Sequence, residues 1–122
     1  MLPNIYYQRY QEFALMLKQL QQAAVGAVPN AQGLRQSFLN AQQFFVQQIV
    51  SLDNKDLDPN VEPKVRSYQT EISKQLQLLG MDMMFLQAAR QQQTATVRQN
   101  QISQRLQTLI GYCNAIIEGT FE

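Results

Sequence analysis

The segment VEPKVRSYQTEISKQLQLLGMDMMFL, from Val61 to Leu86, has apolar residues at alternating spacings of three and four. This period places the apolar residues on one face of an α-helix. The face comprises Val61, Val65, Tyr68, Ile72, Leu76, Leu79, Met83 and Leu86. Gly80 within the segment costs about 1 kcal/mol relative to alanine, which such a long helix tolerates. We therefore predict a long helix from about Val61 to about Gln93.

The same periodicity recurs in three other segments, which predict helices over Asn4–Val25, Ala31–Asp53 and Ala95–Glu118. Their apolar faces comprise Tyr6, Tyr10, Phe13, Leu17, Leu20 and Ala24; Leu34, Phe38, Ala41, Phe45, Ile49 and Leu52; and Ile102, Leu106, Leu109, Cys113 and Ile116. Four amphipathic helices with short links favour an antiparallel bundle. We therefore predict an all-α protein, with residues 1–122 forming a single four-helix bundle domain whose long third helix projects at its end.

The ends of these helices have recognisable sequence signals. Gly26 suits the end of the first helix, and the Val28–Asn30 segment predicts a turn in which Asn30 caps the second helix. The polar segment Asn54–Asn60 is the clearest linker, and Gly119 is a natural cap after the last helix.

The boundary between the last two helices is the least defined. Large apolar residues almost vanish between Leu86 and Ile102, and we predict a tight turn near Thr94–Thr96. The alternative is one continuous helix from Val61 to Glu118, about 85 Å long at the α-helical rise, which would need a partner chain to cover it.

Composition limits the function classes. The net charge of the 122-residue chain is only +1, so we expect no nucleic acid partner. The apolar runs are too short for membrane insertion, and the first ten residues lack the pattern of a secretory signal. The single cysteine excludes an internal disulfide framework. These features together favour a cytoplasmic protein.

The residues that most enzymes need are missing. The chain has no histidine, which excludes nucleophiles activated by imidazole and the metal motifs of di-iron bundles. Cys113 lies on an apolar helix face and is expected to be structural. Glu71 and Asp82 are interpreted as a solvated flank of the third helix. We therefore expect no catalytic residue, no metal and no cofactor, and hence a protein that is not an enzyme.

Two helices carry more apolar residues than one core face requires. The additional residues are Leu39, Val46 and Val50 on the second helix, and Leu78, Met81, Phe85 and, further round, Met84 on the third. Either the third helix is buried on two faces, or this patch is exposed and binds a second copy or a partner. Under the second interpretation, we expect a homodimer formed through the patch.

Charge is segregated along the second half of the chain. Arg90, Arg98 and Arg105 fall between Asp82 and Glu118, a range that holds no other acidic residue. These arginines either form a solvated tip or provide a weakly basic surface that binds an acidic protein partner.

The segments Gln43–Asp53 (QFFVQQIVSLD), Val65–Arg90 and Gln101–Ile117 (QISQRLQTLIGYCNAII) resemble PatD, the cyanobacterial heterocyst frequency control family. The likeness is one of overall sequence, without a signature motif, so no contact residue is transferred. It implies a small cytoplasmic regulator of cell differentiation that binds the tubulin-like division protein FtsZ and promotes its filament assembly. The alternative is a helical adaptor or assembly factor for another cytoplasmic complex.

Overall fold

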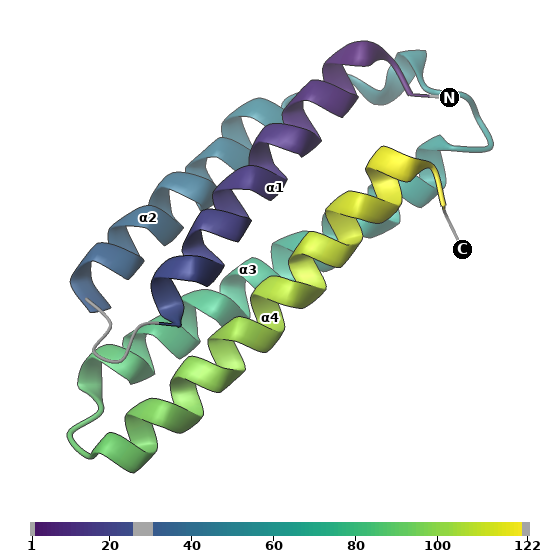
Figure 1. The fold of residues 1–122 in the computed structure, drawn as a ribbon. Helices are drawn as coiled ribbons and strands as arrows, with labels where there is room; N and C mark the ends of the chain where they lie inside the picture. Colours follow the sequence, from purple (N-terminus) through teal and green to yellow (C-terminus); the bar gives the residue numbers. More distant parts are fainter. Residues whose placement is uncertain (1, 26–30, 121–122) are drawn as a thin grey trace.

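The protein is an antiparallel bundle of four helices (Figure 1). The computed structural model describes residues 2–25 and 31–120. The helices are α1 (Asn4–Ala24), α2 (Ala31–Phe44), α3 (Glu62–Ala88) and α4 (Gln92–Glu118). Two short elements, the π-helix η1 (Phe45–Val50) and the 3-10 helix η2 (Asn54–Asp56), lie between α2 and α3. The predicted all-α class, the four helices and the long third helix are confirmed.

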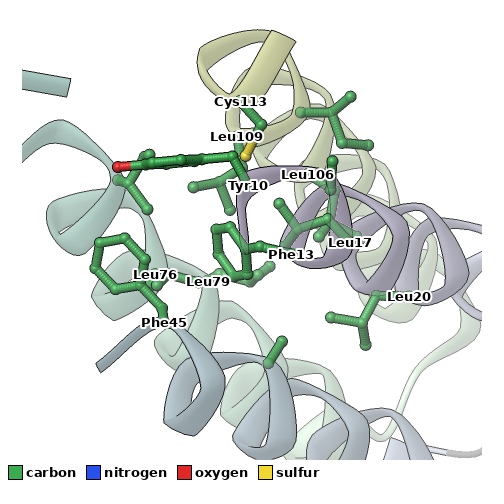
Figure 2. Close-up of a cluster of buried hydrophobic side chains, with 14 of the residues drawn as sticks. Tyr10, Phe13, Leu17, Leu20, Phe45, Leu76, Leu79, Leu106, Leu109 and Cys113 are labelled. Atoms are coloured by element: carbon green, nitrogen blue, oxygen red, sulfur yellow. The ribbon is translucent and has the colours of Figure 1, made fainter. Parts of the chain in front are cut away.

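The core lies along the axis of the bundle, where the predicted apolar faces meet. Every helix contributes buried side chains, and Figure 2 shows Tyr10, Phe13, Leu76 and Leu109 converging from α1, α3 and α4. The Phe13 ring packs on that of Phe45 at 5.4 Å between centroids. α1 packs against α2 and α4, and α3 packs against the same two helices. All four helices therefore share one apolar cluster.

The second helix does not continue to Asp53 as predicted. Its α-helical part ends at Phe44, and a wider π-helical turn then runs to Val50. Side chains of α1 bind the backbone of this π-helical segment and the residues after it. Arg9 donates to the Gln48 carbonyl oxygen at 2.9 Å. The Tyr6 hydroxyl donates to the Asp53 carbonyl oxygen at 2.9 Å. In a continuous α-helix, these carbonyl oxygens would accept bonds from backbone N–H groups four residues later. Here the α1 side chains supply the donors instead.

The turn between α3 and α4 lies earlier than predicted. Residues 89–91 form it, and Thr94 and Thr96 lie in the first turns of α4. The prediction failed because threonine is tolerated inside a helix when its hydroxyl bonds the preceding turn. The Thr96 hydroxyl does so, donating to the Gln92 carbonyl oxygen at 3.0 Å. The continuous helix is also excluded, since α3 and α4 are separate.

The other residues predicted to end or begin helices can be compared with the structure in part. Gly119 ends α4 in the left-handed conformation with φ 70°, as predicted for its cap. Gly26 and the segment Val28–Asn30, including the predicted cap Asn30, lie outside the described residues. The α3–α4 turn extends beyond the neighbouring ends of α1 and α2, which is the predicted projection (Figure 1).

Candidate protein-interaction surface

An apolar surface lies exposed over α2, η1 and α3. Its members are Leu39, Val46, Val50, Met81, Met84 and Phe85, and each is between 43% and 56% exposed. We call these six residues the α2–α3 apolar surface. Leu78, which was predicted to belong to the same patch, is half-buried. The alternative that α3 is buried on two faces is therefore wrong, because Met81 and Phe85 face outward. Self-association through this surface stays a prediction.

A groove follows the line between α2–η1 and α3, and we call it the α2–α3 groove. It consists of two adjoining hollows, of about 420 and 450 Å³, which share Gln77. The first hollow is lined by Arg35, Phe38, Leu39, Gln42, Leu76, Gly80, Met81 and Met84. The second is lined by Phe45, Val50, Arg66, Gln69, Thr70, Ser73 and Lys74. The groove thus joins part of the apolar surface to cationic side chains.

The floor of the groove depends on a glycine. A Cβ built on Gly80 would lie only 3.2 Å from the Phe38 ring. The missing side chain at Gly80 therefore lets the aromatic ring of α2 approach the backbone of α3 closely. This close contact explains why α3 carries glycine at this position despite its cost in a helix.

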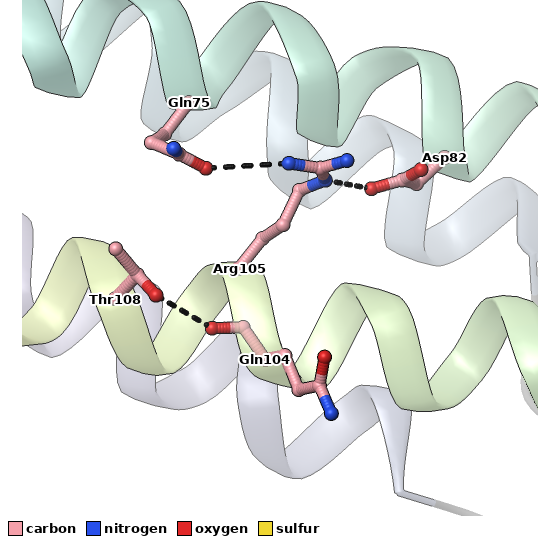
Figure 3. A network of polar contacts seen from close by, with 5 residues as sticks. All are labelled: Gln75, Asp82, Gln104, Arg105 and Thr108. Atoms are coloured by element: carbon pink, nitrogen blue, oxygen red, sulfur yellow. Dashed lines mark hydrogen bonds and ion pairs between the residues drawn. The ribbon is translucent and has the colours of Figure 1, made fainter.

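Arg105, one of the three predicted partner-binding arginines, is part of a polar network between α3 and α4 (Figure 3). Its Nε donates to Asp82 Oδ2, and its Nη1 donates to Gln75 Oε1 at 3.4 Å. The Asp82 side chain is 5% exposed and that of Arg105 is 21% exposed. The interpretation of Asp82 as part of a solvated flank is wrong. Arg105 compensates the buried carboxylate and is only partly available to a partner.

The other two arginines lie nearer the α3–α4 turn. The Arg98 guanidinium lies over the Phe85 ring, 4.5 Å from its centroid, which is cation–π geometry. Arg90 is exposed within the turn itself. The structure therefore joins Arg98 to the apolar surface through Phe85, whereas Arg105 serves the contact between α3 and α4.

Sequence reasoning missed the cations of the groove: Arg35, Arg66 and Lys74. Arg66 and Lys74 are eight residues apart, close to two helical turns, and thus share a face of α3. That spacing was a usable signal. Arg35 lies on another helix and joins this group only through the packing of α2 on α3.

The buried ionisable groups do not form a reactive site. Burial raises the pKa of the Cys113 thiol to about 12, so the thiol stays protonated at neutral pH and is a poor nucleophile. Burial likewise raises the pKa of the Tyr10 phenol, whose oxygen accepts a bond of 3.3 Å from Gln69. Among the described residues, no three histidine, cysteine, aspartate or glutamate side chains group as metal ligands would.

No protein-family model, curated protein or solved structure gives a significant match to the chain. None of the helices in the described ranges has the length and apolar character needed to cross a membrane. Structural support for a function therefore comes from the α2–α3 apolar surface and the α2–α3 groove.

Proposed function

We propose that this protein is a non-enzymatic cytoplasmic regulator that acts by binding another protein. The observation that carries the proposal is the α2–α3 apolar surface. Its six large side chains are about half exposed, whereas most residues of the predicted core faces are buried. Leu39, Met81 and Met84 line one hollow together. Groups of exposed large apolar side chains often mark interaction sites, and methionines such as Met81 and Met84 adapt to varied partners.

We further propose that the partner is FtsZ and that binding promotes the assembly of its filaments. The support is the sequence resemblance to the PatD family. Two of the resembling segments, Gln43–Asp53 and Val65–Arg90, include five of the six residues of the α2–α3 apolar surface. Arg98 adds positive charge beside Phe85, and the exposed Arg90 adds another in the α3–α4 turn, for an acidic filament surface.

Sedimentation of FtsZ with GTP tests this proposal. The protein should appear in the pellet with the polymer and should increase the amount of polymer. The double variant Met81→Ser/Phe85→Ser should lose most of both effects, while Leu15→Ser, which changes an exposed apolar residue of α1, should retain them. The absence of co-sedimentation, together with an unchanged polymer yield, would exclude FtsZ as the partner.

Charge reversal tests the contribution of the arginines. Arg90→Glu/Arg98→Glu should weaken association with FtsZ most at low ionic strength, where surface charges are least screened. Lys18→Glu/Lys55→Glu, at two other exposed cations, is the control with the same change of net charge. Equal affinity of both variants at low salt would show that Arg90 and Arg98 take no part in binding.

The second candidate is a helical adaptor or assembly factor for another cytoplasmic complex. The α2–α3 groove favours it, since a groove between two helices suits the helix of many kinds of partner. Affinity capture with the native chain and with Met81→Ser/Phe85→Ser, followed by mass spectrometry, distinguishes the candidates. A protein other than FtsZ that is captured only by the native chain would support the adaptor.

A further inference from the structure

The α2–α3 groove combines an apolar floor with charge of a single sign. None of the described residues that line its two hollows is acidic, whereas three are cationic: Arg35, Arg66 and Lys74. We propose that this groove binds an amphipathic helix of a partner protein whose apolar face is flanked by acidic side chains. The inference rests on the proposed protein-binding function and names the chemistry of the segment that is bound.

The shape and lining of the groove fit a helix. Leu39, Met81 and Met84 line one hollow, and Phe45 and Val50 line the other, so apolar contacts extend along the whole groove. A helix lying between two others inserts apolar residues at spacings of three and four into such a lining. The π-helical turn η1 forms one wall, and π-helical turns occur frequently at functional sites.

The length of the groove sets the length of the segment. From Arg35 to Val50 the α2–η1 wall spans about 20 Å at the helical rise per residue. A partner helix of about 14 residues, or four turns, covers that distance. Such a helix has room for four apolar side chains on the face toward the groove and for acidic residues along both sides of this face.

The cations of the groove are available to a partner. Lys74 is exposed and has no ion pair among the described residues, and Arg35 makes only a long bond of 3.5 Å to Gln87. Arg66 pairs with Glu62 of the preceding turn at 2.7 Å, but its side chain is 65% exposed. Acidic side chains of a partner would therefore gain contacts here without breaking a buried ion pair.

A second copy of the chain is a poor occupant because its helices offer few acidic side chains to the groove. α2 and η1 contain no acidic residue, α1 contains only Glu12, and α4 contains only Glu118. On α3, Asp82 is buried against Arg105, Glu62 pairs with Arg66, and Glu71 is half-buried. Two grooves facing each other would place cation against cation, which opposes association. This reasoning favours a partner of another sequence over the predicted homodimer.

Fluorescence anisotropy with labelled 15-residue helical peptides tests the inference. The peptides share one leucine face at spacings of three and four, and carry glutamate, glutamine or lysine beside it. The glutamate peptide should bind about tenfold more tightly than the lysine peptide, as expected for three exposed ion pairs. Arg35→Glu/Lys74→Glu should abolish or reverse this preference, and Leu39→Ser/Met81→Ser should weaken binding of all three peptides. Ile5→Ser/Leu15→Ser on α1 and Lys18→Glu/Lys55→Glu, at exposed cations that do not line the groove, are the matched double controls and should bind like the native chain.

Three results would overturn the inference. The first is equal binding of the glutamate and lysine peptides, and the second is unchanged affinity of the groove variants. The third is a stable dimer in sedimentation equilibrium that Met81→Lys converts to a folded monomer, because a second copy would then occupy the groove. Circular dichroism of each variant verifies its fold.

The same variants separate this inference from the proposed function. If FtsZ co-sediments equally with the native chain and with Leu39→Ser/Met81→Ser, the groove inference fails and FtsZ binding stands. If FtsZ does not co-sediment but the glutamate peptide binds the groove selectively, the assignment of FtsZ fails and the groove inference stands.

Discussion

Replacing Arg105 by methionine leaves Asp82, the one charged residue that is buried among those described, without its ionic partner. Methionine keeps much of the apolar stem of arginine but supplies no donor to the carboxylate. The variant therefore isolates the ion pair from the packing around it. It also tests whether Arg105, predicted from the sequence to bind a partner, has a structural role.

The expected loss of stability is large for a single substitution. Removing one partner of a buried ion pair costs about 3–5 kcal/mol. Because the Arg105 side chain is 21% exposed, water reaches the pair, and we expect a loss near the lower limit, about 3 kcal/mol. For a chain of 122 residues, this corresponds to a decrease in Tm of about 10 °C.

Urea titrations followed by circular dichroism measure this loss. The double variant Asp82→Leu/Arg105→Met should recover most of it, since an apolar pair can replace a buried ion pair at little cost. Lys74→Met, which removes an exposed cation of α3 without an ion pair among the described residues, is the matched control and should lose less than about 0.5 kcal/mol. A loss below about 1 kcal/mol for Arg105→Met would refute the reasoning. It would show that solvent compensates the Asp82 carboxylate.

The core and the helix ends allow further tests. Because burial raises the pKa of the Cys113 thiol from 9.0 to about 12, the unfolded chain loses this proton first as the pH rises. The free energy of unfolding should therefore fall between about pH 9 and pH 12, and Cys113→Val should reduce that slope in urea titrations. A Cβ added at Gly111 meets no atom within 4 Å, so Gly111→Ala should raise Tm by about 3 °C in a thermal melt, and a decrease would contradict the open space. Gly119→Ala should lower Tm by a similar amount because the φ of 70° disfavours a side chain; an unchanged Tm would mean that the cap contributes little. Met81→Ser should shift Tm by less than about 2 °C, whereas Leu79→Ala, in the core, should lower it by about 8 °C or more; equal shifts would place Met81 in the core.

Apolar periodicity predicts some features of this fold well and others poorly. A spacing of three and four identifies the face of each helix that is buried, and every residue of the predicted α4 face, from Ile102 to Ile116, is buried. Periodicity says little about helix ends, which depend on single side chains. The Thr96 hydroxyl bonds the Gln92 carbonyl oxygen within α4, so the predicted turn residues lie inside the helix and the turn lies at residues 89–91.

The candidate site was less predictable because it depends on contacts between helices. Asp82 and Arg105 are 23 residues apart and lie on different helices, so neither residue indicates the pair by its local sequence. The apolar residues of α2 and α3 fitted a buried helix as well as an exposed surface. Only the packing of the bundle distinguishes these cases: among the described residues, Met81, Met84 and Phe85 on the outer face of α3 stay about half exposed.

Charged side chains are scarce in this chain. Charged residues make up only 16% of the chain, and much of the polar surface consists of glutamine, whose amide donates and accepts without a preference for the sign of a partner's charge. Under the proposed helix binding, discrimination between partners would depend on the cations of the α2–α3 groove: Arg35, Arg66 and Lys74. Arg105, by contrast, neutralises Asp82 between α3 and α4. Reversing the charge of the groove cations should therefore change which partner helix binds, with little change in Tm. Removing Arg105 should instead lower Tm, with little effect on which partner helix binds.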